Sequence, residues 1–170
     1  MRRLVLALVL LTGCAQATPV DPAKIQPDGF VTDLADMLSD GEEAKLEQRL
    51  QAYKDSTSNE VAVLTVPSLN GIPLEQFAIT VAESWGVGRE DRDNGVLVLI
   101  AKADHEARVE VGLGLEGAIT DIEATAMVDK QKSAFASAFR EEHYAQGLDS
   151  VVDAIAIAAA GEYTGDPTTT

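Results

Sequence analysis

Apolar residues occur along this chain with two different spacings, and these spacings predict its secondary structure. Residues 60–66 and 96–101 are almost continuously apolar and rich in valine and leucine, which is typical of strands buried on both faces of a sheet. Between them, apolar residues recur at helical spacing over residues 74–85. Because a helix joins the two strands, we expect them to be parallel, with a right-handed connection.

The other periodic segments complete one α/β domain. A capping box, in which Glu42 follows Ser39 by three residues, predicts a helix that ends near Lys54. With helices covering both faces, we predict a three-layer α/β/α sandwich around a mixed, mostly parallel sheet with one antiparallel hairpin strand. The remaining segments are a short extended edge, the hairpin strand and two helices, at residues 29–38, 108–111, 120–140 and 144–161.

The first fourteen residues have the order of a secretory signal. Residues 1–3 are basic, residues 4–11 are apolar, and small residues lead to Cys14, the only cysteine in the chain. The apolar run is far shorter than the roughly 20 residues that a membrane-spanning helix needs. The sequence Leu-Thr-Gly-Cys that ends at Cys14 resembles the lipobox of bacterial lipoproteins, in which the cysteine becomes the first mature residue and carries acyl chains. An ordinary secreted protein is the alternative.

The lipobox resemblance sets the expected domain boundaries and location. Several acyl chains would anchor the chain firmly, and Ala15 in place of an aspartate favours the outer membrane of a bacterial envelope, with the protein facing the periplasm. Proline and small polar residues after Cys14 predict an extended tether. The expected parts are a signal peptide, a tether, one domain and a disordered tail, at residues 1–13, 14–28, 29–161 and 162–170.

The chain is strongly acidic, with 28 Asp and Glu residues, 13 Lys and Arg residues and a formal net charge of −15 at pH 7. Nucleic acid is a poor partner for such a surface, because phosphate binding requires clustered Lys and Arg. Anionic lipid headgroups are equally poor partners, so acyl chains would have to hold the protein at a membrane. A single cysteine excludes an intramolecular disulfide and a cysteine-rich metal site.

A glycine motif at residues 112–117 matches the pattern G-x-G-x-x-G but does not predict nucleotide binding. The strand before it leaves a hairpin, and no strand ending in an acidic residue follows roughly 20 residues later, as a dinucleotide site requires. Glu116 would also place a negative charge in the loop that holds the pyrophosphate. We expect the glycines to allow a tight exit from an edge strand.

Four stretches of the sequence form a pattern that is typical of one family. They are residues 31–35 with Leu38 and Ser39, residues 60–66, residues 85–88 running into 93–97, and residues 108–117. At this spacing they resemble the TPM domain of thylakoid lumen and bacterial envelope proteins, over about residues 29–160. Relatives usually have tyrosine where Leu113 stands and often asparagine where Thr32 stands.

The resemblance implies an α/β/α sandwich that works in an envelope or lumen compartment. It also implies that members can bind calcium through an acidic cluster at one end of the sheet. Some members have been proposed to be acid phosphatases. Activity differs across the family, so the resemblance alone does not assign it here.

The predicted strand order brings acidic residues toward one end of the sheet. Asp93 and Asn94 precede the second buried strand, and Glu116 follows the antiparallel strand beside it, so these residues share one end. Asp121 is close to Glu116 in sequence, and Asp33 would join them if its segment ran as an edge strand beginning at that end. Together these residues would supply the oxygen ligands that Ca²⁺ prefers.

Each candidate ligand also has a structural interpretation. Asp93 and Asn94, with the glycine that follows, are common turn residues. Asp121 would be stabilised by the helix dipole in the first turn of a helix, and Asp33 could cap the backbone amides of Ala35 or Asp36. Glu116 stands alone among glycines, and for this residue we favour the ligand role.

The residues favour binding over catalysis. Cys14 would be acylated, and His105 and His143 are expected at the surface away from the acidic residues, so no triad with a nucleophile is predicted. We therefore expect a lipid-anchored envelope protein that binds calcium and protein partners and supports the assembly or maintenance of membrane complexes. A metal-dependent acid phosphatase and a metal-free structural interaction domain are the alternatives.

Overall fold

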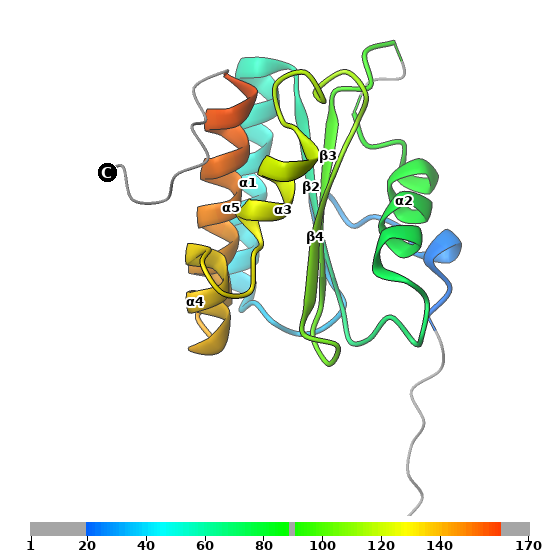
Figure 1. The fold of residues 1–170 in the computed structure, drawn as a ribbon, viewed down its shortest axis with the longest axis vertical. Coiled ribbons are helices and arrows are strands. Elements are labelled where there is room, and N and C mark those ends of the chain that lie inside the picture. Colours follow the sequence, from blue (N-terminus) through cyan, green and yellow to red (C-terminus); the bar gives the residue numbers. More distant parts are fainter. Residues whose placement is uncertain (1–19, 89–90, 161–170) are drawn as a thin grey trace, which may run out of the picture.

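The structure, a computed structural model, describes residues 20–88 and 91–160 of the chain. A four-stranded sheet lies between two layers (Figure 1), with α2 on one face and α1, α3, α4 and α5 on the other. This arrangement confirms the predicted three-layer α/β/α sandwich. The elements in chain order are the 3-10 helix η1 (Pro22–Lys24), β1 (Val31–Asp33), α1 (Asp40–Thr57), β2 (Glu60–Val66), α2 (Leu74–Trp85), β3 (Gly95–Ala101), β4 (Glu106–Val111), α3 (Asp121–Met127), α4 (Ala134–Arg140) and α5 (Tyr144–Ala159).

The strands lie in the order β1-β2-β3-β4. The first three run parallel, and β4 runs antiparallel to β3, which confirms the mixed sheet and its hairpin strand. The edge strand β1 is short, and its residues Val31 and Asp33 align with Val63 and Thr65 in the second half of β2. The carboxyl ends of the three parallel strands therefore meet the β3–β4 hairpin at one end of the sheet.

Alternate residues of the central strands pack on opposite faces of the sheet. In β3, Val96, Val98 and Ile100 belong to the core beneath α1 and α5, whereas Leu97 and Leu99 belong to the core beneath α2. Each of these side chains is at most 1% exposed. Two covered faces explain why the strands are continuous apolar runs in the sequence and do not alternate with polar residues.

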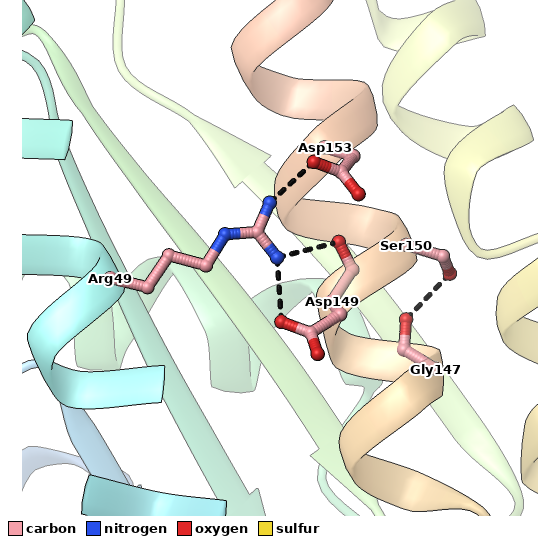
Figure 2. Close-up of polar contacts among 5 residues, drawn as sticks. All are labelled: Arg49, Gly147, Asp149, Ser150 and Asp153. Carbon is pink, nitrogen blue, oxygen red and sulfur yellow. Dashed lines mark hydrogen bonds and ion pairs between the residues drawn. The ribbon is translucent and has the colours of Figure 1, made fainter. Parts of the chain in front are cut away.

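An arginine joins the two long helices of the larger layer. Figure 2 shows Arg49 of α1 between Asp149 and Asp153 of α5, with Nη1 2.6 Å from one carboxylate and Nη2 2.5 Å from the other. Both aspartates are more than half exposed. Water screens such pairs to about 1 kcal/mol or less, so the buried leucines Leu46 and Leu50 of α1 stabilise this layer more.

The predicted helix at 120–140 is two helices in the structure, so the prediction of one helix is wrong. Between α3 and α4, Asp129 Oδ1 accepts the backbone N–H groups two and three residues later, at 2.8 and 3.0 Å. Ser133 then caps α4, its Oγ accepting the N–H of Ala136 at 3.1 Å. Such local bonds compete with the hydrogen bonds of a continuous helix.

Residues 20–28 pack against the domain, whereas the sequence predicted an extended tether over residues 14–28. Ile25 is buried in the core beneath α2, and its carbonyl accepts the indole N–H of Trp85 at 2.8 Å. The predicted tether is therefore too long at its carboxyl end.

The predicted signal peptide, Cys14 and the tail at 162–170 lie outside the described residues. No helix of the described ranges is long and apolar enough to cross a membrane.

Tyr53 of α1 carries a hydroxyl that is buried without a hydrogen-bond partner among the described residues. Leaving a buried polar group unpaired costs about 1–3 kcal/mol, so we expect Tyr53→Phe to raise the free energy of unfolding by about 1 kcal/mol. Urea denaturation measures the change. The hydroxyl of Tyr144 is not buried in this way, so Tyr144→Phe is the control; a destabilised Tyr53→Phe variant would mean that the hydroxyl has a partner.

Candidate functional site

The structure separates Asp33 from the other predicted calcium ligands. Asp33 ends β1 and aligns with Thr65, which in turn aligns with Ile100 of β3. The loop with Asp93 lies before Gly95, the first residue of β3. Ile100 lies about 17 Å along the strand from Gly95, at roughly 3.3 Å per residue. Asp33 therefore lies toward the opposite end of the sheet, and its prediction as a ligand in this cluster is wrong.

Asp33 has a structural role where it lies. Its Oδ2 accepts the backbone N–H groups of Met37 and Leu38 at 2.8 and 2.7 Å, and its Oδ1 accepts the hydroxyl of Thr65. The Thr65 hydroxyl in turn accepts the N–H of Ala35 at 3.1 Å. Asp33 therefore caps backbone amides, but those of Met37 and Leu38 and not those of Ala35 or Asp36, and this network holds the turn between β1 and α1.

The glycines after β4 allow the backbone to approach the loop before β3. The N–H of Gly112 donates to the carbonyl of Gly95 at 2.8 Å, and that of Gly114 to the carbonyl of Asp93 at 3.0 Å. A Cβ atom at Gly114 would lie 1.8 Å from the carbonyl oxygen of Arg92. Close backbone packing thus explains the glycine motif without a nucleotide.

Asn94 is buried and ties the same loop to the end of α1. Its Nδ2 donates to the carbonyl of Ser58 at 2.6 Å and to Oδ1 of Asn59 at 3.2 Å. The neighbouring Asp93 has a left-handed backbone with φ of 48°. Asparagine and aspartate tolerate this conformation, so the turn interpretation describes both residues.

Two of the predicted acidic residues, Asp93 and Glu116, flank the pairing of β3 and β4 at the predicted end of the sheet, and both are exposed. Asp121 instead lines a separate hollow, which it shares with Arg108 and Val109 of β4. Among the described residues, no group of three or more His, Cys, Asp or Glu side chains is positioned to hold a metal ion.

Near Asp33, four carboxylates line a hollow at the start of α1, and the sequence did not predict this grouping. Glu47 accepts the N–H groups of Phe30 and Val31 at 2.9 Å, which positions β1. Burial, followed by the negative charges of Asp33 and other acidic neighbours, raises the pKa of Glu43. The hollow is lined by Asp28, Asp40, Glu43 and Glu47.

Replacing Glu43 by glutamine is expected to stabilise the protein near neutral pH. Because the folded state raises the pKa of Glu43 above its ordinary value of 4.5, the folded protein binds more protons than the unfolded chain in the window above that value. Its stability therefore falls as the pH rises through this window. Urea denaturation should show a gain for Glu43→Gln at neutral pH that disappears below pH 4.5. An equal gain at both pH values would contradict this cause. Glu83→Gln, on an exposed position of α2, is the control.

A large concave site in the described ranges lies at the end of the sheet opposite Asp93 and Glu116, at the carboxyl ends of the parallel strands. It is a pocket of about 530 Å³ between α4 and the β3–β4 hairpin, which lie at the same end of the molecule (Figure 1). Its wall includes Phe135 and Phe139, and its rim includes Lys102, His105 and Arg140. In open α/β sheets, ligands bind outside the carboxyl ends of the strands, so this is the expected place for a binding site.

The family comparison decides the identity of the domain. A family model described as the TPM domain matches residues 31–158. The chain belongs to the TPM domain family. This confirms the resemblance predicted from the sequence, and the match includes both the acidic loops and the pocket of this TPM domain.

Solved structures resemble this TPM domain over most of its length. The solution NMR structure of the N-terminal domain of a protein from P. gingivalis has 36% sequence identity and a TM-score of 0.67, and the match covers 78% of this chain and 82% of that domain. The N-terminal domain of the cg2496 protein from Corynebacterium glutamicum has 16% identity and a TM-score of 0.57 over 84% and 85% of the two chains, which shows the fold alone. The search of curated proteins found no match.

The pocket was not predicted from the sequence. Its residues come from the β3–β4 hairpin, the turn after α3, α4 and the start of α5. The available signal was the presence of Lys102 and His105 around the hairpin turn of an otherwise acidic chain. His105 is exposed, as predicted, but it also lines the pocket.

Proposed function

We propose that this TPM domain is a binding domain of the bacterial envelope, tethered to the membrane by acyl chains on Cys14. In this role it supports the assembly or maintenance of membrane complexes and does not itself catalyse a reaction. The observation that carries the proposal is the pocket at the carboxyl ends of β1–β3. Its volume of about 530 Å³ lies within the range of roughly 300–1,000 Å³ that is usual for ligand sites.

The proposed anchor would keep the domain close to the membrane. Cys14 precedes Val20, the first described residue, by six positions, and an extended chain of that length reaches about 20 Å. If Cys14 is acylated, Cys14→Ser should move the protein from the membrane fraction to the soluble fraction. Retention of Cys14→Ser in membranes that resist a high-salt wash would contradict the lipid anchor.

Site-specific cross-linking tests the binding role. A photo-reactive amino acid in place of Glu142, on the rim of the pocket, should form an adduct with an envelope component in intact cells. The same amino acid in place of Asp55, an exposed residue in the last turns of α1, should form none. No adduct at Glu142, or equal adducts at both positions, would contradict binding through the pocket.

Calcium binding is a second candidate, and the exposure of Asp93, Glu116 and Asp121 favours it. None of these three carboxylates makes a hydrogen bond or ion pair with the described residues, so each is available to a cation. Since Asp121 lies apart, calcium would have to draw the loops together around Asp93, Asn94 and Glu116. Calorimetric titration with calcium, after a chelator has removed bound metal from the protein, tests this candidate. Saturable binding that Glu116→Gln abolishes supports it, and absence of heat contradicts it.

A metal-dependent acid phosphatase remains the enzymatic alternative. The name of the matching family model includes the word phosphatase, and the cations Lys102 and Arg140 of the pocket suit the charge of a phosphoryl group. The test is hydrolysis of a phosphate ester, assayed with and without added metal ions. Hydrolysis by the wild-type protein that is lost in Arg140→Gln would favour this alternative over the binding role.

A further inference from the structure

The pocket between α4 and the β3–β4 hairpin has an aromatic wall. The rings of Phe135 and Phe139 lie 5.0 Å apart between centroids, and those of Phe139 and Tyr144 lie 4.9 Å apart in an edge-to-face arrangement. Val128 and Ala136 extend this apolar surface. Since the backbone of Phe135 is fixed in α4 and its side chain is only 4% exposed, the wall is formed before any ligand binds.

Basic side chains stand at the edge of the aromatic wall. Lys102 Nζ donates to the carbonyl of Ala35 at 2.9 Å and lies 5.9 Å from the ring centroid of Tyr144, so its ammonium is held beside the wall. Arg140 donates from Nη1 to the carbonyl of Lys130 at 2.9 Å, which leaves the rest of its guanidinium available. Within the described part of the chain, neither Lys102 nor Arg140 forms an ion pair with a carboxylate.

This positive rim contrasts with the charge of the whole chain. The chain carries a formal charge of −15, yet the pocket lining has three Lys and Arg residues against two carboxylates. One of these carboxylates, Glu106, is already paired with Lys130 at 2.7 Å. An anion would therefore find at the pocket two neighbouring cations, Lys102 and Arg140, that form no ion pair with a described carboxylate.

We propose that the pocket binds an amphiphilic organic anion, with an apolar chain or ring against the aromatic wall and one carboxylate or phosphate monoester between Lys102 and Arg140. A guanidinium holds such oxygen pairs in a bidentate, charge-assisted arrangement. This proposal rests on the proposed binding function and names the chemical class of its ligand. The apolar body provides most of the buried surface, and the anionic head fixes the orientation of the ligand.

Calorimetry with four probes of equal chain length tests the proposal on the full chain carrying Cys14→Ser, which cannot be acylated. Decanoate and decyl phosphate should bind saturably. Decanol should bind at least about tenfold more weakly because it lacks the charge-assisted hydrogen bonds, and decylammonium not measurably because it would meet two cations. The two anions also distinguish a carboxylate from a phosphate as the natural head group.

Matched variants locate the binding. Arg140→Gln should weaken both anions about tenfold or more and leave decanol unchanged, whereas Lys132→Gln, an exposed cation nearby that does not line the pocket, should change neither. Ala136→Trp should block all binding by filling the pocket.

Equal binding of decanol and decanoate, or anion binding that Arg140→Gln does not weaken, would overturn the proposal. If no probe binds while the Glu142 adduct still forms in cells, the ligand class is wrong and the binding function stands. If no probe binds and no Glu142 adduct forms in cells, both the ligand class and the binding function are wrong.

Discussion

Replacing Phe77 by alanine is expected to lower the free energy of unfolding by about 3–5 kcal/mol. Phe77 is fully buried in α2 and is the largest of the fully buried side chains in the described ranges. It packs in the core formed with Leu64 of β2 and Leu97 and Leu99 of β3, so its loss would leave a cavity beneath α2. Small domains are typically stable by about 5–15 kcal/mol, so this one change removes a large share of the total.

Urea denaturation followed by circular dichroism measures this loss. The control is Ile79→Ala in the same helix, because Ile79 is 37% exposed and should cost about 1 kcal/mol or less. A cost below about 1 kcal/mol for Phe77→Ala would mean that α2 does not pack on the sheet as described.

The second large effect is expected at Gly95, where Gly95→Ala should cost about 3 kcal/mol or more, at the upper end of the usual range for overpacking. A Cβ atom at this position would lie 2.1 Å from the carbonyl oxygen of Val87 and 2.7 Å from the backbone nitrogen of Gly88. Both are backbone atoms that a side-chain rotation cannot move. The start of the central strand β3 would have to shift away from the loop that follows α2.

Gly117→Ala, in the glycine motif at residues 112–117, provides the matched control. A Cβ atom at Gly117 would meet no other atom within 4 Å, so this variant should be close to wild type in urea denaturation. A Gly95→Ala protein as stable as the Gly117→Ala protein would show that the two backbone segments do not approach each other closely.

The candidate metal site was only partly predictable, for reasons that differ from residue to residue. Asp93 and Glu116 flank the same pair of adjacent antiparallel strands, so the hairpin alone places them at one end. The position of Asp33 depends on the register of β1, which is set by pairing with β2 across about 30 residues of intervening chain and not by local pattern. The position of Asp121 depends on the direction that α3 takes after the glycine loop, and this direction is set by packing against β4.

The break between α3 and α4 had a local signal that periodicity hides. Asp129 and Ser133 are residues that favour turns and helix N-termini, and here they accept backbone N–H groups between the two helices. The apolar spacing continues through the break because Val128 and Phe135 both pack in the core. A pattern of buried positions therefore predicts which residues face inward more reliably than it predicts whether one helix or two carries them.

The sequence by itself determined the fold class, the two buried parallel strands, the crossover helix, the hairpin and the family, because apolar spacing, caps and turn residues act over short distances. Only the tertiary structure decided the register of the edge strand, the dispersal of the predicted calcium ligands and the existence of the pocket. The pocket combines Lys102, Phe135, Arg140 and Tyr144, which come together through the packing of α4 and α5 on the sheet. That packing is a long-range result of burying apolar surface, and no local sequence pattern encodes it.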